Sequence, residues 1–430
     1  MKGPGSAPRT PATGASHDGT GTGVPPSEHG AGPAFGGRFM APLLLGAVLN
    51  PVNTTAIATA LVAIGHDFGT GPAGTAWLVS SLYLASAVGQ PLMGRLADLL
   101  GPRRVFLAGL VVVCAAGLTG ALASGFGQLI VSRVLLGIGT SAAYPAAMAM
   151  LRTESLRVGR EPPRTVLGRL SLAALGSAAI GPALGGLLTA TTGWRGIFAV
   201  NVPLAIVPLV LGLRWLPRDT VRPARGRDRP AAERTPLSAL LRNRPLVVTC
   251  LRHGLAYLTI YCTLYGFTQW LEEAHRYSSF ATGLVMLPMS GAAAVCSLLG
   301  ARTKGLRAPL TAAAALLALG SGGLFLAHGG TPLAALLLVS ALFGVPQGLS
   351  STGNQAAVYA QAPPGGVGAA AGIQRAAQYL GAVAATALIG LCYGQRATDT
   401  GLHHLATVTG ALSLSLVVLT VTDRALRART

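Results

Sequence analysis

Residues 94–104 read GRLADLLGPRR, a short polar loop between the apolar runs 74–93 and 105–122. The glycine at each end permits a tight turn and a close approach of the two flanking helices. Asp98 can accept charge-assisted hydrogen bonds from guanidinium groups or from a helix N-terminus. An ordinary basic loop would explain the arginine pair but not an acid framed by two glycines. We therefore predict a conformational latch, made of Gly94, Asp98, Gly101, Arg103 and Arg104.

Apolar runs like these two recur along the whole chain of 430 residues, which is 51% hydrophobic and only 10% charged. Soluble domains carry about 25% charged residues, so a soluble enzyme is excluded. A helix of about twenty residues crosses a hydrocarbon layer of about 30 Å. We predict an all-α membrane protein with twelve spans, at 39–64, 74–93, 105–122, 127–150, 166–190, 197–215, 246–270, 280–300, 308–327, 332–356, 366–393 and 402–422.

The polar segments divide these spans into two sets of six. The Arg- and Pro-rich segment between the sets is too polar to enter a bilayer, and the N-terminal segment is rich in Gly, Pro, Ser and Thr. We predict a disordered tail at 1–37, six-helix bundles at 38–215 and 246–423, a linker at 216–245 and a basic tail at 424–430.

The basic residues predict the orientation. Of the 32 Lys and Arg, 24 lie in the tails and in the loops on the side of the tails, whereas the loops on the other side carry three. Because basic residues collect on the cytoplasmic side, we expect both termini in the cytoplasm, beside anionic lipid headgroups. The net charge of +19 does not indicate nucleic acid, since the basic residues are scattered and lack interleaved aromatic residues.

Two further motifs accompany the loop. Residues 133–139 read RVLLGIG, and residues 176–186 read GSAAIGPALGG. Small residues four apart let another helix pack closely, and Pro182 favours a bend. We predict that the second motif forms a mobile helix interface, made of Gly176, Gly181, Pro182, Gly185 and Gly186.

The three motifs together resemble those of the major facilitator superfamily, and residues 176–186 resemble an element typical of its exporters. The sequences WRGIF at 194–198 and NVP at 201–203 resemble those of the drug:proton antiporter branch. This resemblance implies a fold of two six-helix bundles and secondary transport without a cofactor. Two departures are visible: Leu136 replaces the usual glutamine, and the first span has Asn50 and Asn53 where the branch often carries an aspartate.

Polar side chains within the spans are the candidate transport residues. An arginine at mid-helix costs about 2.5–3.5 kcal/mol to insert and therefore normally faces a cavity or a partner. Tyr257, Tyr261 and Tyr265, four residues apart, either wall the substrate path or pack between helices. We predict that the cavity or relay includes Arg133, Asn50, Asn53, Tyr144, Arg375, Gln378 and Tyr261.

A proton site is less evident, because no Asp or Glu lies in the middle of a predicted span. His253, which titrates near neutral pH, is the candidate substitute, although a lone histidine is more often a packing residue. A facilitator or importer that does not use protons is the alternative, and a receptor or scaffold a distant one. The sequence shows no P-loop, no HExxH and no spaced histidine ligands, so we expect no enzymatic activity, no cofactor and no metal.

We thus expect proton-coupled export of a small amphipathic or cationic compound, a drug or a metabolite, by alternating access. The protein is expected to be a monomer that spans the cell membrane many times. Arg greatly outnumbers Lys, and Ala and Gly abound, as in proteins encoded by GC-rich bacterial genes.

Overall fold

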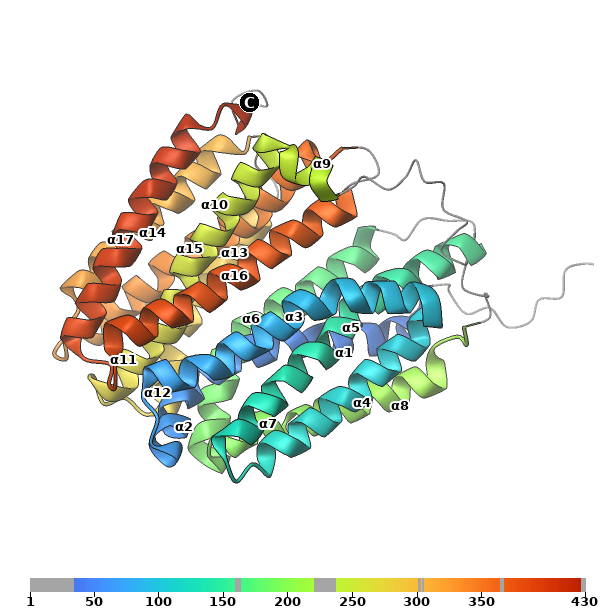
Figure 1. Cartoon of the computed structure of the whole chain (residues 1–430), viewed down its shortest axis with the longest axis horizontal. Coiled ribbons are helices and arrows are strands. Elements are labelled where there is room, and N and C mark those ends of the chain that lie inside the picture. Colours follow the sequence, from blue (N-terminus) through green and yellow to red (C-terminus); the bar gives the residue numbers. More distant parts are fainter. Residues whose placement is uncertain are drawn as a thin grey trace, which may run out of the picture. The chain divides into compact units, whose positions relative to one another are not determined.

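The computed structural model describes residues 35–158, 164–219, 237–300, 303, 305–363 and 367–426. Every regular element in these residues is a helix (Figure 1). Most of the predicted tail at 1–37 lies outside the described residues, as do 220–236 of the predicted linker and 427–430 of the C-terminal tail.

The first half of the chain forms six spans, of which the first and the last are interrupted. Its elements are α1 (Gly37–Thr55), the 3-10 helix η1 (Ala56–Ala60), α2 (Leu61–Phe68), α3 (Pro72–Leu100), α4 (Pro102–Ala121), α5 (Phe126–Val158), α6 (Arg164–Thr192), α7 (Arg195–Ala199) and α8 (Asn201–Trp215).

The second half repeats this plan after a short helix, α9 (Leu237–Arg242). The first span of this half, which is the seventh of the chain, contains a π-helical segment, a feature that is often found at functional sites. The elements are α10 (Arg244–Tyr261), the π-helical η3 (Cys262–Phe267), α11 (Thr268–Glu273), α12 (Ser279–Val285), α13 (Leu287–Gly300), α14 (Arg307–Leu326), α15 (Leu333–Gln361), α16 (Val367–Tyr393), α17 (Asp399–Thr422) and the 3-10 turn η4 (Arg424–Leu426).

Each of the twelve predicted spans coincides with one continuous or interrupted helix. The helices α3 and α5 run on to Leu100 and Val158, beyond the predicted ends at 93 and 150, because polar helix formers continue them past the apolar stretch. We did not predict α9 within the linker. Its Leu240 is fully buried in an apolar cluster with Leu246, Cys250, Val358 and Ala370.

Eleven segments in the described residues are long and apolar enough to cross a membrane. The predicted second span, α3, is not among them, although it is 29 residues long. Its polar side chains explain the difference: Ser80 bonds to Thr386 and Gln90 to Tyr379, both on α16. The polar face of α3 thus lies against the second half of the protein and not against lipid.

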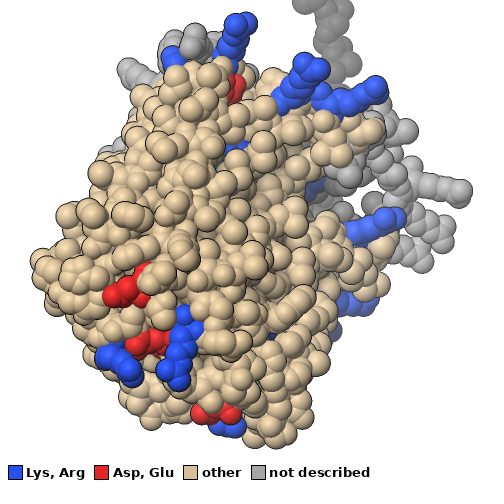
Figure 2. All heavy atoms as spheres, turned by 60° about the vertical axis from the view of Figure 1, so that its left-hand side comes forward, with Lys and Arg blue, Asp and Glu red and all other residues tan. Residues whose placement is uncertain are grey.

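Successive spans are antiparallel, so their ends collect on two sides. We name the side where α1 begins and α17 ends the terminal side, and the other the opposite side. Figure 1 shows α9 at the terminal side and α2, α7, α11 and α12 near the opposite side. In Figure 2 a broad zone with few charged side chains separates an end where basic residues predominate from a mixed group of acidic and basic residues at the other end. Such a zone is what a lipid bilayer requires.

Helix ends follow from local sequence. Gly69 closes α2 with φ of 63° and Gly101 lies between α3 and α4 with φ of 98°, conformations that glycine adopts at little cost. Pro72 and Pro102 then start the next helices, where a missing backbone N–H costs nothing. Ser278 and Thr398 cap α12 and α17 by accepting backbone hydrogen bonds at 3.2 Å.

Close packing of small residues holds the spans together, because lipid supplies little hydrophobic drive between helices. A Cβ atom on Gly109 of α4 would lie 2.8 Å from the carbonyl oxygen of Gly139 on α5. A Cβ atom on Gly348 of α15 would lie 2.7 Å from the backbone nitrogen of Ser297 on α13. Larger residues at these positions would push the helices apart.

Candidate functional site

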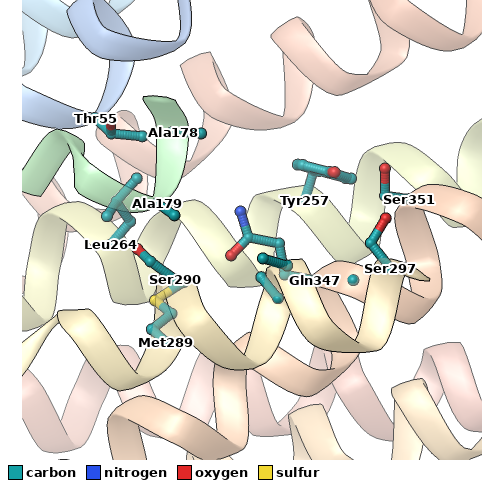
Figure 3. Close-up of a pocket in the computed structure, with 13 residues that line it drawn as sticks. Thr55, Ala178, Ala179, Tyr257, Leu264, Met289, Ser290, Ser297, Gln347 and Ser351 are labelled. Atoms are coloured by element: carbon teal, nitrogen blue, oxygen red, sulfur yellow. The ribbon is translucent and has the colours of Figure 1, made fainter. Parts of the chain in front are cut away.

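A pocket lies where the two halves of the chain meet, between α1 and α6 of the first half and α10, η3, α13 and α15 of the second (Figure 3). The space between its atoms, together with adjoining open solvent, amounts to about 490 Å³. Among the described residues no charged side chain lines the pocket, and Figure 3 shows Gln347 extending between Leu264 and Tyr257. Its polar lining consists of Thr55, Tyr257, Ser290, Ser297, Gln347 and Ser351.

The two halves are closed against each other at the opposite side. A Cβ atom on Gly283 of α12 would lie 2.6 Å from the carbonyl oxygen of Pro182 on α6. A Cβ atom on Gly71 would lie 2.8 Å from the Cα atom of Gln395, which follows α16. Such contacts leave no room for a methyl group, so a substrate cannot pass at this side in the described conformation.

A cluster of four tyrosines, Tyr83, Tyr261, Tyr265 and Tyr379, joins the halves near mid-span. The hydroxyl groups of Tyr83 and Tyr265 are 3.0 Å apart, and Tyr265 donates to the carbonyl oxygen of Thr54 at 2.7 Å. The Tyr83 ring centroid lies 5.3 Å from that of Tyr261 and 5.4 Å from that of Tyr379. Both sequence interpretations of the tyrosine spacing therefore apply: Tyr257 lines the pocket, whereas Tyr261 and Tyr265 pack at the interface.

Arg133 is fully buried among α1, α3 and α5. Its Nε donates to the carbonyl oxygen of Leu78 at 2.8 Å and one terminal nitrogen to that of Asn53 at 3.1 Å, while the other has no hydrogen-bond partner among the residues that the structure describes. In this conformation the guanidinium group of Arg133 thus contacts backbone carbonyl groups. Its predicted place in a transport cavity or relay stays a prediction.

The two predicted asparagines of α1 point in different directions. Asn50 donates to Thr140 of α5 at 3.1 Å and is partly exposed. Asn53 is buried and donates to the amide oxygen of Asn201 on α8 at 2.5 Å. Asn53 therefore ties the first and sixth spans together, and only Asn50 retains access to solvent.

Three of the other candidates form one hydrogen-bonded chain. Arg375 donates to Gln378 at 3.1 Å, and Gln378 donates to the hydroxyl group of Tyr261 at 3.0 Å. Tyr144 of α5, which is 56% exposed, lies close enough to Arg375 to interact with it electrostatically. These four residues face one another across the two halves.

His253 is buried on α10 beside the ring of Tyr257, at 4.6 Å between centroids, and 3.5 Å from the amide of Gln374. The adjacent Arg252 forms a buried ion pair with Asp423, at 2.7 Å, and also donates to Asn354 at 2.9 Å. No acidic partner for the ring of His253 occurs in the described residues. A proton role for His253 stays a prediction.

The predicted loop at 94–104 is helical except at Gly101, since α3 runs to Leu100 and α4 begins at Pro102. A residue that we did not predict fixes this junction. The backbone N–H groups of Arg103 and Arg104, at the start of α4, each donate to the carboxylate of Asp219 at 3.2 Å. The Arg103 side chain reaches the carbonyl oxygen of Leu213 at 2.9 Å. Asp98 belongs to the last turn of α3, and its side chain lies outside the described part of the structure. The anion at this helix N-terminus is thus Asp219, which follows α8.

Replacing Asp219 with alanine is expected to lower the free energy of unfolding by about 1 kcal/mol, because the start of α4 loses its acceptor and its favourable charge. Thermal unfolding of the purified protein in detergent measures this change. Asp219→Asn is the matched control: it keeps an acceptor and loses only the charge, so its loss should be smaller. Equal melting temperatures for the alanine variant and the wild type would contradict the assignment.

The predicted helix interface at 176–186 has two sides. Gly181 packs against Thr55, and a Cβ atom on Gly185 would lie 2.7 Å from the hydroxyl oxygen of Thr59, both in the first half. Gly186 instead packs against the backbone of Ser279, in the second half. Among the described residues, no atom outside the adjacent backbone of α6 lies within 4 Å of where a Cβ on Gly176 would be, so the packing role of Gly176 stays a prediction.

The comparison with known families decides the identity of this fold. The Major Facilitator Superfamily matches residues 43–386, most of the chain. The chain belongs to this superfamily. It is therefore a membrane transporter and not an enzyme, and the predicted fold class is confirmed.

Relatives of this superfamily member differ in how much of it they match. An uncharacterised transporter of Bacillus subtilis, YwoD, is 29% identical over 88% of this chain and 96% of its own length. The cephamycin export protein CmcT of Amycolatopsis lactamdurans is 39% identical, but over only 40% of this chain and 35% of its own. The crystal structure of the nucleoside transporter NupG has the same fold, with a TM-score of 0.71 at 12% identity, covering 88% of this chain and 98% of that one.

Several contacts of this transporter could not be found by searching for motifs. Tyr83, Gln90 and Tyr379 lie inside apolar runs and belong to none of the three motifs. The one signal that could have found them is their polarity in helices that otherwise face lipid. No such signal marked Asp219, because an acidic residue in a polar linker is expected to be exposed to water and not to bind a helix N-terminus.

Proposed function

We propose that this transporter exports a small amphipathic compound across the bacterial cell membrane by alternating access. The observation that carries the proposal is the pocket between the two halves, closed at the opposite side by the contacts of Gly71 and Gly283. If the basic terminal side is cytoplasmic, the described conformation loads its substrate from the cytoplasm. The name of the relative CmcT, a cephamycin export protein, also supports export.

In this proposal the residues of the 94–104 and 176–186 motifs take part in the conformational change, and the residues that line the pocket bind the substrate. Pro182 and Gly186 form the contact with α12 that separates when the opposite side opens, while Gly181 and Gly185 keep α6 on α1. The loop at 94–104 stabilises one of the two conformations from the terminal side. The protein acts as a monomer in a bilayer, and neither half encloses the pocket alone.

We further propose that export is coupled to the movement of protons. Arg133 and His253 are buried polar groups that could respond to a proton, directly or through a neighbour. A facilitator that does not use protons is the second candidate. The observation favouring it is that the described acidic residues lie in terminal helix turns and loops and not at mid-span.

A pH-gradient assay in inside-out vesicles tests the proposal. We expect a subset of a panel of amphipathic dyes, antibiotics and metabolites to dissipate the gradient only in vesicles that contain the protein. The variant Asp98→Asn should insert normally and lower the flux about tenfold or more, because an amide cannot accept the charge-assisted hydrogen bonds that we predict for the latch, each worth about 1.5–3 kcal/mol.

Two results would contradict parts of this proposal. Substrate movement that persists after the gradient is collapsed would favour the facilitator. Undiminished flux in the Asp98→Asn variant, with equal amounts in the membrane, would refute the latch while leaving export intact.

A further inference from the structure

Arg375 is a charged group that is exposed deep within the spanning region. It lies about 12 Å along α16 from Val367, at a rise of 1.5 Å per residue. The hydroxyl groups of Tyr144, Tyr257, Tyr261 and Tyr379 lie close enough to interact with it electrostatically. Its exposed surface therefore faces the space between the halves and not lipid.

The guanidinium group of Arg375 has no acidic partner in the described residues. Its one hydrogen bond there is to the amide oxygen of Gln378, and it takes part in none of the ion pairs. A guanidinium group has five N–H donors, so most of those of Arg375 have no hydrogen-bond partner among the described residues. An exposed cation without a counter-charge at this depth is costly unless a ligand supplies that charge.

The acidic residues of the described chain cannot supply the charge. Asp67, Glu154, Asp219, Glu272, Glu273, Asp399 and Asp423 all lie in terminal helix turns or in loops. Asp98 also lies only about 3 Å from the end of α3, at 1.5 Å per residue, whereas Arg375 lies about 12 Å inside α16. A cationic substrate would thus meet an arginine and no carboxylate.

Aromatic surfaces flank Arg375 on both halves of the protein. Tyr257 lines the pocket from α10, and Tyr144 is 56% exposed on α5. Tyrosine rings present a flat apolar face together with a polar edge, which suits a planar ligand. The pocket beside Tyr257 offers hydroxyl and amide groups but no charge.

We propose that the exposed surface of Arg375, between the two halves of the protein, binds a small aromatic carboxylate, whose carboxylate group pairs with Arg375 while its ring packs between Tyr144 and Tyr257. This inference rests on the proposed transport function and names its substrate class. A planar guanidinium group matches a carboxylate with two parallel hydrogen bonds, which an ammonium group of lysine cannot make.

Three naphthalene compounds with the same ring and different charge test this inference: 2-naphthoate, 2-naphthamide and 2-(aminomethyl)naphthalene. Binding to the purified full-length protein is measured by titration calorimetry, and flux is measured separately in proteoliposomes. We expect 2-naphthoate to bind best and the amine worst. Arg375→Gln should weaken naphthoate binding about tenfold or more, to the level of the amide, because the charge-assisted pair is lost.

Two further variants make the result specific. Arg375→Lys keeps the charge but loses the planar fork, so its naphthoate affinity should lie between those of the wild type and Arg375→Gln. Arg396→Gln is the matched control, since it removes the same charge from an exposed residue beyond the end of the same helix. It should leave all three affinities within about twofold, because charges in water are screened.

The outcomes separate this inference from the transport proposal. Best binding by the amine, unchanged naphthoate affinity in both Arg375 variants, or no binding of any naphthyl compound would overturn the inference. Flux of the compounds without dependence on Arg375 would leave transport standing and refute the carboxylate site. Binding that depends on Arg375 without any flux would support the site and count against transport.

Discussion

Replacing Asp423 with alanine is expected to lower the free energy of unfolding by about 3–5 kcal/mol, because it leaves the buried Arg252 without its counter-charge. The Arg252 side chain is 2% exposed and that of Asp423 7%, with 2.7 Å between their charged atoms. The same guanidinium group also donates to Asn354 and Thr249, so it cannot turn toward water without breaking two further hydrogen bonds.

Thermal and denaturant unfolding in detergent measures this loss. The double variant Arg252→Met with Asp423→Leu should recover most of it, because removing both charges also removes their desolvation cost. Arg157→Ala breaks an ion pair whose arginine is 63% exposed, and it should cost no more than about 1 kcal/mol. A single Asp423 variant that is as stable as Arg157→Ala would show that the buried pair does not hold α10 to α17.

The number and order of the helices could be predicted from the sequence, because a membrane span is recognised by its length and its hydropathy. All twelve spans were placed from apolar runs, and the departures have local causes: the polar ends of α3 and α5, and the short α9. The weak point was α3, whose Ser80 and Gln90 lower its hydropathy because they face α16 and not lipid. A one-dimensional measure of hydropathy cannot distinguish a polar face at an interface from a polar loop.

The candidate site was harder to predict, because it depends on which residues from distant spans meet. The sequence indicated Arg375, Gln378 and Tyr261, which form one hydrogen-bonded chain in the structure. It could not show that Arg133 is enclosed by the backbone of α1 and α3, or that Asp219 reaches the start of α4. Contacts of this kind are set by tertiary packing, which leaves no periodic trace in the sequence.

Cysteines introduced at Ser80 and Thr386 are expected to form a disulfide that abolishes transport until it is reduced. The two hydroxyl oxygens are 2.7 Å apart on α3 and α16, so the side chains already point at each other across the halves. A disulfide needs Cβ atoms about 3.5–4.5 Å apart, and two hydroxyl groups in hydrogen-bond contact bring their Cβ atoms near that range. The bond would hold the opposite side closed, and alternating access requires that side to open.

The double variant is made in a background without the five native cysteines, and flux is measured in proteoliposomes before and after a thiol reductant. Ser80→Cys alone is the matched control and should transport equally in both conditions. We expect at least about a tenfold loss in the oxidised double variant, because a covalent bond raises the free energy of opening far above the roughly 1.4 kcal/mol that each factor of ten represents. Full flux through the cross-linked protein, with the disulfide confirmed by mass spectrometry, would mean that α3 and α16 stay together throughout the cycle. The moving interface would then lie elsewhere, with the contact of α6 and α12 at Gly186 as the next position to cross-link.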